Sequence, residues 1–411
     1  MKFFILLKKA FYLLIKKKIR FSIKNLLNRE LILAGNDNTV EFLKEPILNS
    51  FNYSYLPYKT FEKKDIYYIT PKIIIFFLNG FFIKKLNLTN SYLYSIFKVS
   101  KPSAVFSQSF DHNLIFVAKE LKHIKFFVLL QGTWFNITKK GLSFVYYSYN
   151  YNLSKCRTGN LKNFNIFVWG QKDQDIFEDI GVNKFEKNVN FLKVGSYESS
   201  YYSHKFSSRY IIENNSILFI SQLQPHIFSI NHKFQKLILR DSITAIKLVL
   251  NFAIKNNIEF RYLCRGKNNN NRIELDYLRL KISNFKNIKI VENKSEALWN
   301  EIFASKLVTS CYSTGAHDAI LLKKKTILLP LNHKNIYKWS SDKFKDDISF
   351  WPWTILRDDQ EKFDKLCKNL LNMNDTIYRE QIKKIHSYWF DKRYNESHNV
   401  IKDIIKNEIR Q

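Results

Sequence analysis

Short apolar segments that end in glycine or polar residues recur along this chain, and most of them precede a stretch with helical periodicity. The segment 30–35 (ELILAG) sets the pattern, because it ends in a turn signal before the helical residues 39–48. Short buried strands that alternate with helices pair in parallel, since each helix carries the chain back to the starting edge of the sheet. Further strands of this kind are expected at 103–108, 125–130, 165–169 and 191–194.

The pattern restarts after residues 198–215, where periodicity is lost and serine, tyrosine and asparagine accumulate. We place a domain boundary there. Strands are then expected at 216–221, 259–263, 288–291, 306–309 and 326–330, with helices at 234–256, 274–282, 295–304 (Ser295 as N-cap) and 315–322. The sequence therefore predicts an α/β fold of two Rossmann-like domains that face a cleft. The expected divisions are a basic segment at 1–28, domains at 29–205 and 213–358, and a helical C-terminal tail at 359–411.

Composition limits the class of protein. The length of 411 residues suits two domains, and 45% hydrophobic residues exclude a disordered chain. Lysine and arginine exceed aspartate and glutamate by 66 − 36 = 30 charges. Such an excess favours anionic partners. The general over-use of Lys, Asn, Ile, Phe and Tyr, as in proteins of AT-rich genomes, accounts for it equally well.

The cysteines and the apolar runs predict a cytoplasmic protein. Cys156, Cys264, Cys311 and Cys367 lie far apart, which argues against a disulfide framework and a structural metal. The longest apolar run, 72–83, is shorter than the ~18 residues that cross a bilayer. Residues 1–28 combine apolar patches with lysine clusters, as in an amphipathic helix on the anionic inner face of a membrane. The alternative is a helix packed on the first domain.

Ligands of open parallel sheets bind beyond the carboxyl ends of the strands. In the second domain, Ser313, Thr314 and Gly315 follow an expected strand and start a helix, where backbone N–H groups can hold an anion. Asp318, one turn later, could bind ribose hydroxyls. An ordinary helix N-cap explains the hydroxyls equally well. Nucleotide or phosphate contacts are also expected at the ends of the two neighbouring strands, from Ser221, Gln222, Arg265 and Lys267.

The first domain is expected to hold the acceptor. Gln131 and Gly132 follow one strand, and Asp111 and His112 follow another. Asp111 or His112 is a candidate general base for deprotonating an acceptor hydroxyl. A helix N-cap at Asp111 and a hydrogen-bonded histidine at 112 are the structural alternatives. The sequence contains no GxxxxGK[ST], GxGxxG, GxSxG or HExxH motif and no DxD triplet. We therefore expect neither a metal nor a cofactor.

Taken in order, these residues resemble bacterial surface-carbohydrate glycosyltransferases of the GT-B type, related to Kdo and capsule transferases. The resemblance runs from residue 31 to the C-terminus. It is carried by Asp111 with Asn113, Gln131-Gly132, Trp169-Gly170, Val194-Gly195-Ser196, Ile220-Ser221-Gln222, Arg265, and Ser313-Thr314-Gly315 with Asp318. It implies that the Ser-Thr turn holds the donor phosphate and the acid holds its ribose. Two residues depart from the family pattern: Asp318 replaces a commoner glutamate, and Arg265-Gly266 replaces the His-Pro of many CMP-sugar transferases.

The expected activity is transfer of a sugar from a nucleotide-sugar donor to a lipid-linked or oligosaccharide acceptor in capsule or lipopolysaccharide assembly. A glycerol-phosphate or ribitol-phosphate transferase of the same fold is the closest alternative. A basic nucleic-acid-binding protein without catalysis is the alternative from another class. The scattering of lysines along the whole chain, rather than on one aromatic-rich face, argues against nucleic acid.

Overall fold

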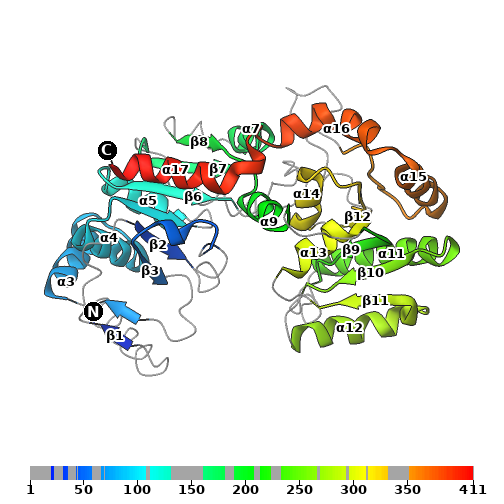
Figure 1. The fold of residues 1–411 in the computed structure, drawn as a ribbon. Coiled ribbons are helices and arrows are strands. Elements are labelled where there is room, and N and C mark those ends of the chain that lie inside the picture. The colour runs from blue at the N-terminus through cyan, green and yellow to red at the C-terminus, as the bar shows by residue number, and fades with distance from the viewer. Residues whose placement is uncertain are drawn as a thin grey trace.

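The computed structural model describes residues 20–22, 31–35, 43, 45–57, 66–68, 70–107, 112–130, 161–180, 189–207, 213–223, 233–265, 269–292, 296–311, 313–331 and 351–410. These residues form two α/β units that lie side by side, and the C-terminal helices run across the top of both (Figure 1). The residues that were expected to form the basic N-terminal segment lie outside the described residues, apart from Arg20–Ser22.

The first domain is built on a parallel sheet in the order β3-β2-β5-β6-β7-β8. Side chains alternate between the two faces of the sheet. Val105 packs into the hydrophobic core on one face of the sheet, whereas Ala104 and Phe106 pack into the core on the opposite face. The strands are β2 (Leu31–Gly35), β3 (Tyr53–Pro57), β5 (Ala104–Ser107), β6 (Lys125–Leu129), β7 (Phe164–Val168) and β8 (Asn190–Lys193).

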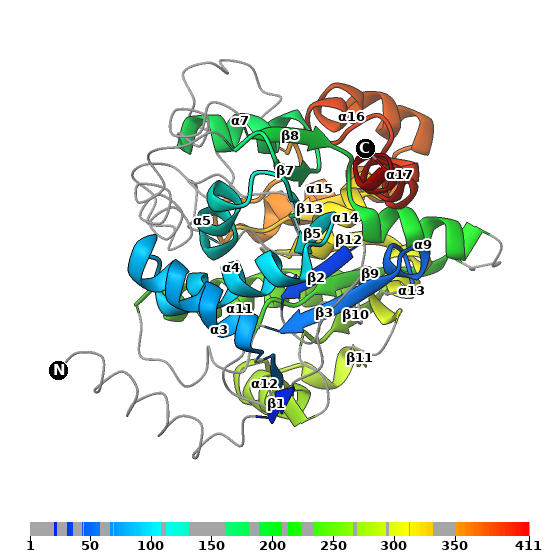
Figure 2. The same ribbon diagram turned by 90° about the vertical axis from the view of Figure 1, so that its left-hand side faces the viewer.

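Helices cover both faces of this sheet (Figure 2). On one face lie α3 (Pro71–Leu78), η2 (Asn79–Ile83), α4 (Leu88–Ser100) and α5 (His112–Glu120). Helix α7 (Gln171–Ile180) follows β7. The short strands β1 (Arg20–Ser22) and β4 (Ile66–Tyr68) form a separate parallel pair. The expected helix at 39–48 is described in part: residue 43 is helical, and η1 (Leu48–Ser50) is a 3₁₀ turn.

The second domain has a five-stranded parallel sheet in the order β11-β10-β9-β12-β13. All five expected strands are present, as β9 (Asn214–Ile220), β10 (Glu259–Leu263), β11 (Ile288–Val291), β12 (Ser305–Ser310) and β13 (Thr326–Leu328). The helices are α11 (Lys233–Lys255), α12 (Asn269–Lys281), α13 (Ala297–Ala304) and α14 (Thr314–Leu321). Together with the first sheet, this confirms the predicted α/β fold of two parallel sheets.

One helix was not predicted, and one helix cap was predicted at the wrong residue. The segment 198–215 was expected to be a domain boundary without α/β periodicity, but α9 (Tyr197–Ser207) extends through residue 207 of it. The buried side of α9 consists of small and aromatic residues, among them Ser199, Ser200 and Phe206. It therefore lacks the apolar periodicity from which an amphipathic helix is usually predicted. Ser295 was expected to cap the next helix, but the N-cap of α13 is Glu296, in a left-handed conformation with φ of 65°.

The predicted helical tail is confirmed, and its last helix returns to the first domain. After α15 (Gln360–Asn372) and α16 (Asp375–Trp389), helix α17 (Ser397–Arg410) places Ile401 and Ile405 in the core beside β5 and β6. The crossing is tight at Gly170, where a Cβ would lie 2.3 Å from the carbonyl oxygen of Trp389. At Gly195, φ is +82° and a Cβ would lie 2.7 Å from Ser397 Oγ. The two strand-end glycines therefore make room for the returning chain.

Within the residues that the structure describes, none of the helices has the length and apolar character needed to span a bilayer.

Candidate functional site

The strand order of the second sheet creates a candidate binding edge. β9 lies at the centre, with β10 on one side and β12 on the other. The chain therefore changes direction across the sheet between β9 and β12. Such a switch point leaves a crevice outside the carboxyl ends of the two strands, and this is where ligands of open α/β sheets bind. Residues 221–223, at the end of β9, and 310, 311 and 313–315, at the end of β12, lie at this candidate edge.

Hydrogen bonds from serines hold the two strand ends together. Ser310 donates its hydroxyl to the carbonyl oxygen of Ile220 (2.8 Å), which ties the end of β12 to the end of β9. The backbone N–H of Ser313 donates to Ser310 Oγ (3.2 Å). Ser313 caps α14 by accepting from the N–H of Gly315 (3.2 Å). The alternative role that the sequence suggested for Ser313, a helix cap, is therefore present, and it orients the first turn of α14 at the crevice.

Gly315 lies where a larger residue would crowd neighbouring side chains. A Cβ at this position would lie 3.0 Å from Cδ1 of Leu298 in α13 and 3.4 Å from Cδ1 of Ile220 in β9. Thr314, the first residue of α14, is half-buried. The structure thus brings Ser221, Ser313, Thr314 and Gly315 to the same edge of the sheet.

A buried carboxylate that the sequence analysis did not identify organises the end of β10. Glu274 in α12 is fully buried and accepts hydrogen bonds from Ser221 Oγ and from the hydroxyl of Tyr262 (2.6 Å). The Tyr262 hydroxyl also lies 2.7 Å from Ser221 Oγ. The second carboxylate oxygen accepts from the backbone N–H of Arg265 (3.2 Å). Glu274 therefore fixes the ends of both β9 and β10. The sequence did not indicate its burial, because the helix that contains it is largely polar.

Arg265 follows β10 and is exposed as a whole residue. Enclosure by protein lowers the pKa of its guanidinium, and the Glu274 carboxylate acts in the opposite direction. Gln222 is half-buried beyond β9, and Lys267 lies outside the described residues. In the first turn of α12, the buried Oδ1 of Asn271 has no hydrogen-bond partner among the described residues. A positive side chain and a spare acceptor therefore lie near the same edge.

Asp318 faces the first domain. Its buried carboxylate accepts from Ser196 Oγ (2.9 Å) and Ser199 Oγ (2.5 Å) at the start of α9. The pKa of Asp318 is raised to about 7, because burial and the nearby Glu198 carboxylate raise it by more than the two serine hydroxyls lower it. A ribose could reach this carboxylate only by displacing the serines, so the arrangement supports a contact between domains.

A second contact between the domains is aromatic and basic. Lys172 of α7 lies over the ring of Trp389 (3.8 Å to the centroid), and His317 of α14 stacks on the same ring (5.7 Å). Burial lowers the pKa of Lys172 to about 8 and that of His317 to about 3. The sequence analysis had assigned no role to these residues. Their burial makes them part of the junction between α7, α14 and α16.

The first-domain candidates fall mostly outside the described residues. These include Asp111, Gln131 and Gly132. His112 is the first residue of α5, and its side chain is not among the described ones. Their roles remain predictions.

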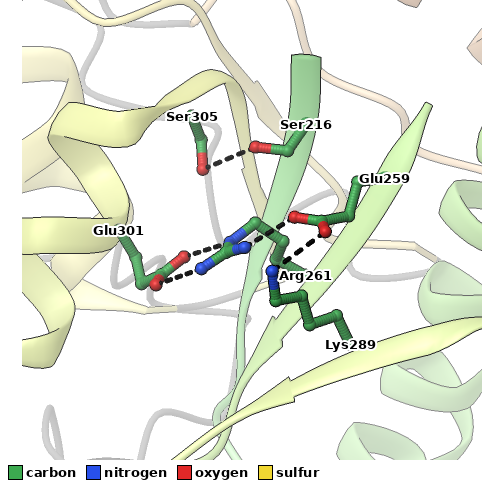
Figure 3. A network of polar contacts seen from close by, with 6 residues as sticks. All are labelled: Ser216, Glu259, Arg261, Lys289, Glu301 and Ser305. Atoms are coloured by element: carbon green, nitrogen blue, oxygen red, sulfur yellow. Dashed lines mark hydrogen bonds and ion pairs between the residues drawn. The ribbon is translucent and has the colours of Figure 1, made fainter. Parts of the chain in front are cut away.

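A separate, partly buried network of charged residues joins β10, β11 and α13 in the second domain (Figure 3). Arg261 of β10 donates from Nε and Nη2 to the two carboxylate oxygens of Glu301 in α13 (2.5 and 2.6 Å). Its Nη1 donates to Glu259 (2.5 Å), which also accepts from Lys289 of β11 (3.0 Å). These charges neutralise one another on the α13 face of the sheet. The neighbouring Tyr262 points to the opposite face, where Glu274 lies.

Comparison with known proteins identifies the fold. No protein-family model matches the chain, and no curated protein matches it either. Its structure is similar to that of the wall teichoic acid polymerase TagF, with 12% identity over 93% of this chain and 90% of that chain and a TM-score of 0.53. It is also similar to a UDP-GlcNAc 2-epimerase from Neisseria meningitidis bound to UDP-GlcNAc (12% identity, 92% and 99% of the two chains, TM-score 0.52).

A third similar structure is a UDP-forming α,α-trehalose-phosphate synthase from Burkholderia xenovorans (10% identity, 93% and 99% of the two chains, TM-score 0.50). Each of the three similarities covers 92% or 93% of this chain. At identities this low, they establish architecture. The chain has the two-domain GT-B fold, with two parallel sheets and a C-terminal helix that returns to the first domain.

Proposed function

We propose that this protein transfers a group, most simply a sugar, from a nucleotide-activated donor to a lipid-linked or oligosaccharide acceptor. The observation that carries the proposal is the edge between β9 and β12, where Ser221 and the turn Ser313–Gly315 meet at the switch point of the sheet. A helix start beside hydroxyl groups suits the phosphates of a nucleotide. Two of the similar structures have UDP or a UDP-sugar in their names, which supports a nucleotide-activated donor.

In this proposal the second domain binds the donor. The backbone N–H groups at the start of α14, the Ser313 and Thr314 hydroxyls and the Arg265 guanidinium would stabilise the charge on the leaving phosphate. Lys267 and Gln222 would add contacts at the neighbouring strand ends. Asp318 is the least suited of the predicted ligands, because it already accepts from Ser196 and Ser199.

The first domain would bind the acceptor, near Gln131 and Gly132, with Asp111 or His112 as the base. Transfer would then need no metal, because the departing phosphate is held by the helix start and Arg265. We propose that the protein works on surface polysaccharide at the inner face of the cytoplasmic membrane, held there by the basic residues of the segment 1–28.

A glycerol-phosphate or ribitol-phosphate transferase is the second candidate. The similarity to a wall teichoic acid polymerase favours it, because that enzyme has the same fold. The two activities differ in the product: one adds a sugar, and the other adds a phosphodiester. Mass analysis of the product formed on a membrane extract separates them.

The test of the proposal is nucleotide binding. Among UDP, CDP, GDP, ADP and CMP, at least one should raise the melting temperature, because a ligand that binds only the native state stabilises it. Replacing Ser313 and Thr314 by alanine should weaken that nucleotide about ten- to a hundredfold, because each loses a hydrogen bond to a charged group. If no nucleotide stabilises the protein, or if the double variant melts earlier but binds equally well, the hydroxyls only cap α14.

A further inference from the structure

An apolar surface with a lysine border lies on the first domain, away from the candidate site. It is formed by α3, η2 and the start of α4, and its exposed side chains are Ile74, Ile75, Leu78, Phe82, Ile83 and Leu88. We call it the α3–η2 surface. Soluble domains seldom expose so many large apolar side chains in one place, and such patches mark sites of interaction. In Figure 1, α3 lies at the outer side of the first domain, away from the second domain.

The local structure turns these side chains outward. Thr70 caps α3, and its Oγ1 accepts from the N–H of Ile73, the residue whose side chain faces the core. The helix then widens into a π-helical turn, in which the N–H of Lys84 donates to the carbonyl oxygen of Asn79 (3.1 Å). A wide turn of this kind adds a residue to the helix and shifts the following side chains around its axis. Phe82 and Ile83 lie at this turn, and Ile83 is 72% exposed.

The charges beside this surface have a single sign. From Thr70 to Lys101 the chain contains no aspartate or glutamate, and its charged residues are Lys72, Lys84, Lys85, Lys98 and Lys101. Lys84 pairs with Glu120 of α5 (2.5 Å). Lys72 and Lys85 are exposed next to the apolar side chains. An apolar face bordered by lysines complements the acyl region and the anionic headgroups of a lipid bilayer.

We infer that the α3–η2 surface docks onto an anionic lipid bilayer, with Ile75, Phe82 and Ile83 entering the acyl boundary and Lys72 and Lys85 at the headgroups. The inference deepens the proposed function, because a lipid-linked acceptor requires the first domain to meet the membrane. It does not depend on the segment 1–28. The inference assigns the membrane contact to the α3–η2 surface of the folded first domain.

The experiment uses the full chain and sedimentation with vesicles of one-third phosphatidylglycerol and two-thirds phosphatidylcholine. The variant Ile75→Glu/Ile83→Glu should lower the partition coefficient at least tenfold, because these two isoleucines would no longer place apolar surface in the bilayer. Lys72→Gln/Lys85→Gln should lower it about fivefold for each lysine, and only on the anionic vesicles. Leu280→Glu/Ile377→Glu is the matched control, since these side chains are 82% and 54% exposed on the second domain and the tail. It should bind like the wild type.

Unchanged vesicle binding by Ile75→Glu/Ile83→Glu would overturn the inference, as would complete loss of binding in Lys16→Gln/Lys17→Gln/Lys18→Gln alone. A wild type that is dimeric without vesicle binding, and becomes monomeric in the glutamate variant, would overturn it in favour of a second copy. If glutamates impair folding, Ile75→Gln/Ile83→Gln replaces them and should still lower binding. Nucleotide stabilisation is measured on the same samples. Its absence would refute the proposed function alone, and loss of vesicle binding in the variants would still support docking.

Discussion

The second domain contains two polar networks, one buried and one partly buried, that lie on opposite faces of β10 and differ in what they hold together. Around Arg261, opposite charges meet directly: the guanidinium contacts Glu301 and Glu259, and Lys289 completes the set. Around Glu274, the partners are hydroxyls and a backbone N–H at the strand ends. The first network joins the body of the sheet to α13, and the second shapes the candidate nucleotide edge. We therefore expect the first to control stability and the second to control both stability and binding.

The largest effect is expected when the charged network is broken. Glu301→Leu leaves the Arg261 guanidinium with Glu259 as its remaining carboxylate, in a buried position. Removing one partner of a buried ion pair typically lowers the free energy of unfolding by about 3 kcal/mol. Urea denaturation measures this loss, and nucleotide affinity of the folded protein should stay unchanged. The double variant Arg261→Met/Glu301→Leu should recover much of the stability. A double variant as unstable as Glu301→Leu would contradict a role for charge compensation.

A smaller loss of stability, together with a loss of binding, is expected at the strand ends. Glu274→Leu removes the acceptor for Ser221, for Tyr262 and for the Arg265 N–H. The hydroxyls of Ser221 and Tyr262 can still hydrogen-bond to each other. We therefore expect the free energy of unfolding to fall by about 2 kcal/mol. Nucleotide affinity should also fall by about tenfold, since Ser221 and Arg265 lose their fixed positions.

Glu274→Gln is the matched control for this variant, because it keeps the shape and one acceptor oxygen. It should retain most of the affinity and stability. If Glu274→Leu and Glu274→Gln both keep the nucleotide affinity of the wild type, the Glu274 network does not position the binding site. The expected difference between the two networks would then disappear.

The effect expected per unit of pH is smallest at Asp318, another carboxylate held by hydroxyls. Burial raises its pKa from 3.8 to about 7 in the folded protein, so between these values the folded state binds more protons than the unfolded state. Asp318 therefore makes its full contribution to the free energy of unfolding below about pH 4, and this contribution is lost as the pH rises to about 7. The loss is on the order of 1 kcal/mol per pH unit within that window.

Asp318→Asn should flatten this part of the pH profile, because an amide oxygen can still accept from Ser196 and Ser199 without titrating. Thermal unfolding of both proteins at about pH 5, 6 and 7 measures the difference. Glu198, whose pKa is also raised by burial, leaves part of the slope in the variant. Parallel profiles for the wild type and the variant would mean that Asp318 does not titrate in this range.

The sequence by itself determined the alternation of short buried strands with helices and hence the class of fold, although it did not reveal β3, α3 or α4. The reason is physical: apolar runs such as SILFI and KFFVL are buried most readily inside a sheet, and the polar residues or glycines that come after them end the strands. The same local logic placed Ser313 at the start of a helix, because a serine before a helical run supplies the missing acceptor for its first N–H groups. Patterns confined to a few neighbouring residues were sufficient for these predictions.

Only the tertiary structure decided which polar side chains are buried and against what. Glu274 and Glu301 belong to helices with ordinary polar residues, and each was distinguishable from a surface glutamate only after β10 brought Tyr262 and Arg261 to its side. Asp318 was assigned to a ribose from the sequence, but the packing of α9 on α14 directs it to Ser196 and Ser199, far away in the sequence. α9 itself was missed for the same reason. Burial of a polar group depends on partners that the chain brings together over long distances, and no local pattern encodes them.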